Sequence, residues 1–371
     1  MRLDGIDART SGIGAFRGHA RRRILFVLAL LAVTAVTALA VLAVDAGVSF
    51  GDLVGILFDR GSNDPIDEGL VWDIGVPRIL SCILAGIALG VAGTVMQCVL
   101  RNPLGSPYTL GVSNAAAFGA SIGIVVMGGG IITGQSSATI TINNPYIVTG
   151  SAFLMALLAT GIIILLVRIT KVSPEAMVLA GVALSSIFSA GISFLQYMYN
   201  EYALSTIVYW QFGSMGKATM EELVIIAVVT LAASLYFLWN RLDYNALETG
   251  DDVASSLGVN VNGLRLLTLF IAAMLTAVIV SFMGVIAFIG LLGPHIVRRI
   301  LGNDHRFLIP GSMIMGALIL LVSDCVGQNL LDFTIPVGIV TSFLGGPLFL
   351  YILIVSYRRR KIRITRRRLS G

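Results

Sequence analysis

Residues 102–167 contain no Asp, Glu, Lys or Arg. A soluble domain usually carries about 25% charged residues, whereas this chain carries 12% and is 56% hydrophobic. A helix needs about 20 apolar residues to cross a bilayer, so the charge-free run is too long for one crossing. Backbone polar groups in lipid must be satisfied within the structure. The chain is therefore predicted to be an all-α integral membrane protein.

The apolar runs predict about ten transmembrane helices. A Gly/Ser/Thr/Asn stretch near 128–145 divides the charge-free run, and Gly284 is the expected break in the run 266–297. The expected spans cover residues 24–44, 79–100, 110–127, 146–167, 176–199, 223–239, 266–297 in two parts, 308–330 and 335–357. We expect a mobile basic segment over 1–23, a single transmembrane domain over 24–357 and a basic tail over 358–371.

The distribution of cations predicts the orientation of these helices. With an even number of spans, all of the 25 Lys and Arg residues except Arg60, Arg78 and Lys217 fall on the side of the two termini. Cations gather on the cytoplasmic side of membrane proteins. Both termini of this multi-pass protein are therefore predicted to be cytoplasmic, where the basic ends suit contact with anionic lipid rather than nucleic acid.

Motifs for nucleotide hydrolysis and catalysis are absent from the sequence. The segment Gly213–Thr219 resembles a phosphate-binding loop, but its spacing is wrong. No Gly-x-Ser-x-Gly motif occurs. The chain is therefore predicted to be a transport subunit and not an enzyme.

No metal-ligand spacing is present either. Cys82, Cys98 and Cys325 lie in or beside apolar runs, as small buried hydrophobic residues do. His295 and His305 are ten residues apart near a helix end, and we interpret them as local structure. The sequence thus predicts no metal site.

Asp324 is the only acidic residue well inside a predicted span. We expect it to accept hydrogen bonds from neighbouring hydroxyls or amides in helix packing. A proton-coupled carrier would need a second ionisable group opposite it, and the sequence offers no obvious one. A largely uncharged pathway suits a bulky solute that is moved by a conformational cycle powered from outside this chain.

The cytoplasmic segment 241–265 contains a short helix signal. Gly250-Asp251-Asp252 is typical of a helix start and Gly258 of a helix end. Val253 and Leu257 give this helix a small apolar edge. The spacing fits an ordinary surface helix and a docking helix for a soluble partner equally well.

Several segments together resemble the FecCD-type permease family, the transmembrane subunits of ferric-siderophore, haem and cobalamin ABC importers. They occur in the order of the family and comprise Val76–Arg78, Leu84–Gln97, Arg101–Pro107, Leu110–Gly111, Leu179–Leu184, Trp210–Ser214, 245–259, Ala287–Arg299, Leu321–Asp324, Ile335–Thr341 and Gly345–Pro347.

The resemblance implies a type II ABC importer permease fold of ten helices in the cytoplasmic membrane of a prokaryote. It implies a core of two permeases, either two copies or a copy and a paralogue. Two cytoplasmic ATPase subunits would hold ATP and Mg²⁺, with no cofactor on this chain, and an extracytoplasmic binding protein would deliver the solute. The expected cargo is an iron chelate, with ferric siderophore favoured and haem or cobalamin as alternatives; a proton-coupled carrier is the distant alternative.

The resemblance also implies roles for particular residues. The ATPase-coupling helix would comprise Gly250, Asp251, Asp252, Val253, Ala254, Leu257 and Gly258. The cytoplasmic gate would lie at Val172, Ser173, Pro174 and Glu175, although these residue types are not typical of the family. Arg78 would pair with the binding protein, and because Gly75 stands where many members have another Arg, this charge has either moved to Arg60 or docking is weaker. The structural motifs would be Arg101, Asn102 and Pro103, then Gly293, Pro294 and His295, and Asp324.

Overall fold

The computed structural model describes residues 4–59, 64–129, 144–170 and 174–351, and within these ranges the chain is helical with no strand. The elements are α1 (Asp4–Ala46), α2 (Phe50–Phe58), α3 (Pro65–Gly69), the π-helix η1 (Leu70–Gly75), α4 (Val76–Val99), α5 (Val112–Val125), α6 (Pro145–Thr170), α7 (Pro174–Met198), α8 (Glu201–Gln211), the 3-10 helix η2 (Met215–Lys217), α9 (Met220–Trp239), α10 (Arg241–Thr249), α11 (Asp251–Ser256), α12 (Val261–Met283), α13 (Ile289–Leu301) and α14 (His305–Asn329). A further apolar helix covers Val337–Tyr351.

The predicted all-α membrane fold is confirmed. Seven helices among the described residues are long and apolar enough to cross a membrane, and α5 and Val337–Tyr351 are shorter apolar helices. The expected break at Gly284 is also confirmed, because α12 ends there with φ +82° and α13 begins at Ile289. The total of ten crossings stays a prediction, since α5, α13 and Val337–Tyr351 are short.

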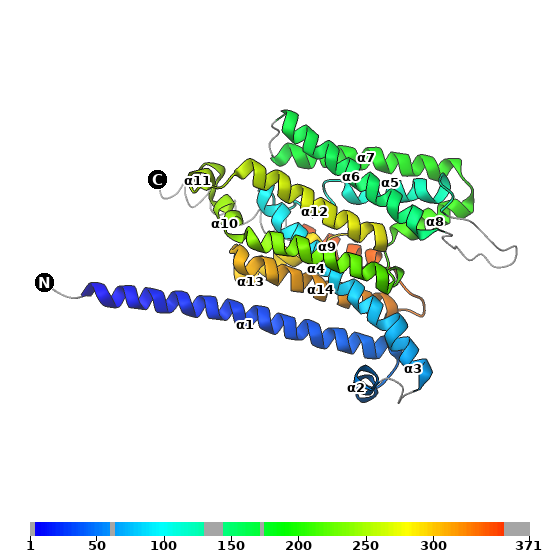
Figure 1. Ribbon diagram of the computed structural model, residues 1–371, viewed down its shortest axis with the longest axis horizontal. Helices are drawn as coiled ribbons and strands as arrows, with labels where there is room; N and C mark the ends of the chain where they lie inside the picture. The colour runs from blue at the N-terminus through cyan, green and yellow to red at the C-terminus, as the bar shows by residue number, and fades with distance from the viewer. Residues whose placement is uncertain (1–3, 60–63, 130–143, 171–173, 352–371) are drawn as a thin grey trace.

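The long helices run side by side in one bundle (Figure 1). α10 and α11 lie at one end of it, which we call the α11 end. α2 and α3 lie at the opposite end, which we call the α2 end. α1 lies along the edge of the bundle and contacts mainly α14 (Figure 1). Residues 4–23 form its first turns; whether they are mobile stays a prediction, and residues 358–371 lie outside the described residues.

α4 is the central helix, packed against α14, α12 and α13. In the most apolar stretch of the span that contains α4, 78% of the residues are buried, against 22% in the corresponding stretch of α1. A Cβ at Gly86 or Gly90 would meet the backbone of α14, and one at Gly93 would meet the carbonyl of Gly290 in α13. Small residues let membrane helices approach closely, so this glycine stripe permits the close contacts of α4 with α14 and α13.

The loops at the α2 end contain short helices that were not predicted. Side chains cap three of them: Ser49 accepts from Asp52 N–H at α2, Asp64 from Ile66 N–H at α3 and Asn200 from Ala203 N–H at α8. Such caps satisfy free N–H groups of the first turn. Runs of five to eleven residues are too short to show a clear apolar period, so the sequence favoured loops.

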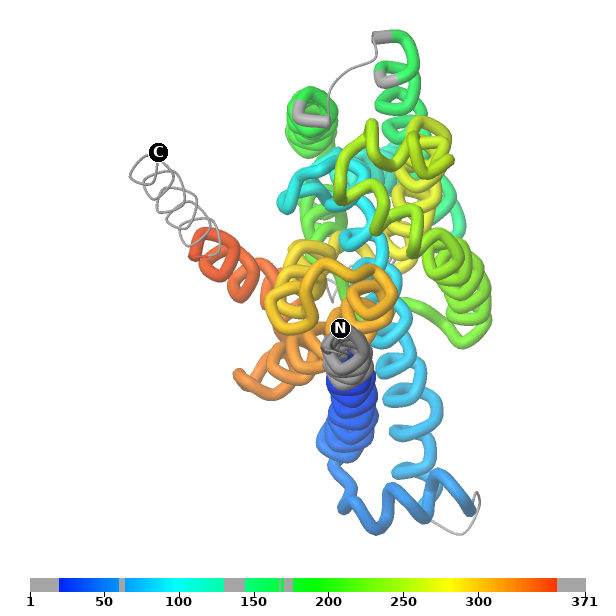
Figure 2. Tube along the Cα trace, turned by 90° about the vertical axis from the view of Figure 1, so that its left-hand side faces the viewer, coloured from blue at the N-terminus to red at the C-terminus, as the bar shows by residue number. Residues whose placement is uncertain are grey.

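Large apolar side chains stay exposed on helices at the rim of the bundle. Leu179 on α7 is 70% exposed and Phe343 on the last helix is 78% exposed. Figure 2 shows that the last helix leads away from the rest of the bundle. Exposed apolar patches of this kind mark lipid or protein contacts, as expected for helices that face a bilayer.

Candidate functional site

The predicted coupling helix is α11, and it lies between two glycines with special backbone. Gly250 has φ +136° and ψ 152°, a region open essentially to glycine alone, and Gly258 has φ +88°. The sequence signals for the start and end of this helix are therefore confirmed. The preceding residues 245–249 belong to a separate helix, α10, so the segment 245–259 is two helices joined at Gly250.

The side chains of α10 and α11 divide into buried anchors and an exposed edge. Tyr244, Leu247 and Ala254 are fully buried against the bundle. Val253 and Leu257 are 47% and 68% exposed. The segment is thus fixed on one side and presents an apolar edge on the other, as a docking element does.

Asp251 ties α11 to the ends of two long helices. Its Oδ1 lies 2.7 Å from Nη2 of Arg101, directly after α4, and 3.1 Å from Nη2 of Arg265 on α12. Arg265 also donates through Nε to the carbonyl of Val99 at 2.9 Å. Arg101 has φ +46°, which is uncommon for a residue with a side chain. Charged hydrogen bonds therefore join α11 to the ends of α4 and α12.

The predicted motifs that begin at Arg101 and Gly293 lie on neighbouring elements of the bundle. Asn102 accepts from Leu104 N–H at 3.0 Å, which fixes the turn after α4. Gln97 links the same helix to α13, because its Nε2 donates to the Gly290 carbonyl at 3.2 Å and its Oε1 accepts from Arg298 at 2.8 Å. Gln97 thus joins α4 to α13, the helix that carries the second motif, and the architectural role of both motifs stays a prediction.

Within the second motif, Gly293 and Pro294 are buried inside α13, and His295 is partly exposed beside them. Pro103 lines a cavity next to α10. α13 thus continues through Pro294 to Leu301, beyond residue 297, where the expected span ends.

A polar network closes the α11 end around Asp304. Burial acts to raise the pKa of Asp304, but hydrogen bonds from Arg306 and Asn245 outweigh it and lower this pKa to about 2. Arg23 of α1 also approaches the carboxylate, at 3.5 Å. The ionised Asp304 therefore links Arg23 of α1 and Asn245 of α10 to the start of α14.

At the α2 end, Asp324 pairs with Arg78. The guanidinium of Arg78 donates from Nε to Oδ2 at 2.6 Å and from Nη2 to Oδ1 at 3.0 Å. The side chains are 14% and 3% exposed. The expectation that Asp324 bonds hydroxyls or amides and has no ionisable group opposite it was wrong, because α4 and α14 are antiparallel neighbours that bring residues 246 positions apart together.

The other predicted docking and gate residues are less fully described. For Arg78, pairing with a binding protein would require its bond to Asp324 to open, and that role stays a prediction. Arg60, Val172 and Ser173 lie outside the described residues. Pro174 and Glu175 are the first two residues of α7, and the structure describes their backbone but not their side chains.

An aromatic cavity in the bundle was missed in the sequence. Phe288 precedes α13 with φ +66°, and its ring lies 6.4 Å from those of Tyr108 and Phe349. The adjoining cavity has a volume of about 410 Å³ and is lined by Tyr108, Gln211, Phe212, Val285, Ala287, Gly338, Ile339, Ser342, Phe343 and Pro347. Strained backbone often lies at functional positions. The residue types around Phe288 do not predict a positive φ there, so the sequence could not reveal this feature.

Comparison with known proteins gives matches over most of the chain. The model of the FecCD transport family matches residues 28–355. The putative ABC transporter permease protein MJ0087 of Methanocaldococcus jannaschii is 43% identical, over 93% of this chain and 98% of its own length. The hemin transport system permease protein HmuU of Yersinia pestis is 34% identical, over 82% of this chain and 88% of its own length.

Other relatives at 33–34% identity are named as permeases for iron(III) citrate, molybdate and vitamin B12. A solved structure described as an inward-facing conformation of a putative metal-chelate type ABC transporter superposes with a TM-score of 0.75 at 29% identity. That match covers 89% of this chain and 98% of the solved chain.

Proposed function

The chain belongs to the FecCD transport family and is a permease of an ABC importer, and from this premise we propose that it imports an iron chelate, with a ferric siderophore as the favoured cargo. In this proposal two cytoplasmic ATPase subunits bind ATP and Mg²⁺, and a binding protein outside the cell delivers the chelate. A second permease, either another copy or a paralogue, completes the pathway. Haem and cobalamin are the alternative cargoes, because relatives named for haem and vitamin B12 are similarly related.

The observation that carries the proposal is the attachment of α11. Its apolar edge, Val253 and Leu257, is free to enter a partner, while Asp251 links it to the ends of α4 and α12. We propose that nucleotide-driven movement of an ATPase subunit pulls α11 and thereby α4 and α12. The gate near 172–175 would then open towards the cytoplasm, and the permease itself would make no covalent chemistry.

The aromatic cavity beside Phe288 supports a bulky cargo with an apolar surface. Its lining includes no ionised side chain, and aromatic faces stack well on planar ligands. A small ion such as molybdate would gain little from such a wall, because it needs charged or hydrogen-bonding partners. The lining therefore favours a large organic chelate over a small oxyanion.

Co-purification tests the subunit assignment. The chain is purified from its native cell in a mild detergent, and the proteins that accompany it are identified by mass spectrometry. A stoichiometric ATPase subunit is expected, together with either no other permease or a single paralogue. Absence of the ATPase under conditions that hold a known importer together would contradict the proposal.

Cargo is then tested in vesicles that contain the purified importer and its binding protein. Uptake of radioiron in a ferric siderophore is measured with an excess of haem, cobalamin or molybdate as competitor. The proposal expects ATP-dependent uptake that molybdate does not inhibit. Preferential inhibition by haem or cobalamin would instead assign that alternative.

A further inference from the structure

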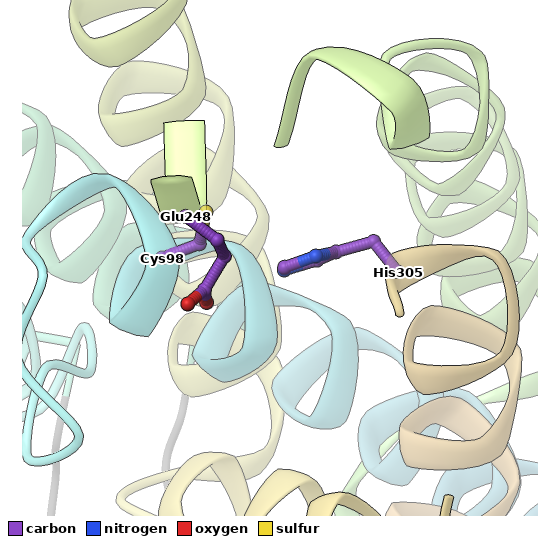
Figure 3. A group of neighbouring side chains, drawn as sticks. All are labelled: Cys98, Glu248 and His305. Carbon is purple, nitrogen blue, oxygen red and sulfur yellow. The ribbon is translucent and has the colours of Figure 1, made fainter. Parts of the chain in front are cut away.

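Three side chains of types that can bind metal ions lie close together at the α11 end, although they are far apart in the sequence. Cys98 lies in the last turn of α4, Glu248 in the last turn of α10, and His305 is the first residue of α14. One ligand atom from each lies within 4.8 Å of the other two. Figure 3 shows the imidazole of His305 pointing towards Cys98 and Glu248. The sequence shows no metal-like spacing, but the fold brings these three side chains together.

One nitrogen of the His305 imidazole, Nδ1, has a hydrogen-bond partner, and the other, Nε2, has none. His305 Nδ1 lies 3.0 Å from Oδ1 of Asn245, and that oxygen also accepts from the His305 N–H at 2.8 Å. The orientation of the amide is fixed because Asn245 Nδ2 donates to Asp304 at 3.0 Å. An amide oxygen can only accept, so Nδ1 carries the proton and Nε2 presents its lone pair.

His305 Nε2 has no hydrogen-bond partner although the side chain is completely buried. Burying a polar atom without a partner is unfavourable, so a native structure rarely leaves one without a reason. A metal ion is the ligand that this nitrogen would accept. The hydrogen bond from Nδ1 to Asn245 is the kind of support that ligating histidines commonly have.

We propose that Cys98, Glu248 and His305 bind a thiophilic divalent cation of the Zn²⁺ class. Thiolate, imidazole and carboxylate are the ligands that Zn²⁺ takes, with bonds of about 2.0–2.3 Å. Cys98 would give up the weak bond from its thiol to the Tyr244 carbonyl, at 3.5 Å. Glu248 is exposed and accepts only a long hydrogen bond from Asn303 Nδ2, at 3.4 Å, among the described residues, so its side chain can close on the ion.

The surroundings define the fourth ligand and the choice of metal. Cys98 and Glu248 line a cavity of about 470 Å³, which gives water access to the fourth position. Arg101 and Arg298 line the same cavity. Their positive charges repel a free cation. The site therefore selects ions that form a strong bond to sulfur, and excludes Mg²⁺ and Ca²⁺, which prefer oxygen ligands.

Metal titration of the full-length chain in detergent tests this proposal without any transport assay. The protein is purified with a tag free of histidine and stripped with a chelator. Zn²⁺ is then titrated against a chromophoric competitor, and Co²⁺ serves as the optical probe. The expected result is one bound equivalent, with thiolate-to-Co²⁺ charge-transfer absorption that Cys98→Ser abolishes. Each of Cys98→Ser, Glu248→Gln and His305→Gln should weaken binding by at least about tenfold.

Matched variants control for other thiols and imidazoles. Cys82→Ser removes a second buried cysteine of α4, and His295→Gln removes a histidine of α13; both should bind as the unmodified chain does. Glu248→Gln changes an exposed side chain and should fold normally, so the test does not depend on the buried variants. No stoichiometric binding, or binding unchanged by all three ligand substitutions, would overturn the proposal.

Discussion

At the scale of single residues, the pair of Arg78 and Asp324 is the most sensitive contact at the α2 end. Both side chains are nearly buried and satisfy each other through two hydrogen bonds. Removing one partner of a buried pair typically costs about 3–5 kcal/mol, because the other charge stays buried. We predict that Asp324→Asn lowers the free energy of unfolding by about this amount, as measured by thermal or denaturant unfolding in detergent.

The double variant Arg78→Met/Asp324→Leu separates structure from transport. It removes both charges and should recover most of the stability that Asp324→Asn loses, because no charge is left unpaired. If the double variant is stable and still imports solute, the pair is structural. A stable double variant without uptake would support the proton-coupled alternative.

Lys217 provides a pH-dependent prediction. Burial lowers its pKa to about 8, and its Nζ lies over the rings of Tyr209 and Trp210. An unfolded chain keeps Lys protonated up to a pKa of about 10.4. Between these values the unfolded state binds more protons, so this residue's contribution to stability rises with pH. Below pH 8 its penalty is fully present.

The matched measurement compares the unmodified chain with Lys217→Met. We expect the difference in melting temperature to favour the methionine variant at pH 7 and to shrink as the pH approaches 10. Using the difference removes the contributions of other titrating groups. A difference that does not vary with pH would show that Lys217 keeps an ordinary pKa in the folded chain.

At the scale of elements, the α4–α14 contact depends on the absence of side chains. A Cβ at Gly90 would collide with the carbonyl of Ser312 in α14. We predict that Gly90→Ala destabilises the chain by about 1–3 kcal/mol, the usual cost of overpacking. Gly161 on α6 has open space around its Cα, so Gly161→Ala should be neutral or slightly stabilising. Equal melting temperatures for both variants would contradict this account of the contact.

The sequence predicts elements well where the signal is local. The apolar runs locate the long helices, Gly284 ends α12, and the Gly250 and Gly258 signals bound α11. It does not predict α2, α3 and α8, because these helices depend on caps and short-range packing. The partner of Asp324 and the cluster of Cys98, Glu248 and His305 depend on helix pairing, which chain spacing does not contain.

At the scale of the whole molecule, Asp251 is predicted to couple the permease to its ATPase. Asp251→Asn weakens the bonds to Arg101 and Arg265 but leaves the apolar edge of α11 intact. If these ion pairs contribute about 1 kcal/mol, their loss changes the equilibrium constant between two states of the permease about fivefold. We therefore expect uptake per ATP hydrolysed to fall by roughly that factor in vesicles.

Asp252→Asn is the matched control, since the described residues give its carboxylate no ion pair. Its uptake per ATP should equal that of the unmodified chain. Equal losses in both variants would mean that acidic character at the start of α11, and not the link to α4 and α12, matters for coupling.

The partnership of α1 and α14 also sets a constraint on biosynthesis. Arg23 of α1 and Asp304, the cap of α14, are 281 positions apart, and α1 has its main contacts with α14. At synthesis rates of about 5–20 residues per second, roughly 15–60 s separate their emergence from the ribosome. During that interval α1 can pack only against early elements such as η1 and α4 and lacks its main partner, α14. Arg78 of α4 likewise has no Asp324 to pair with until α14 is made, so both long-range contacts form only late in synthesis.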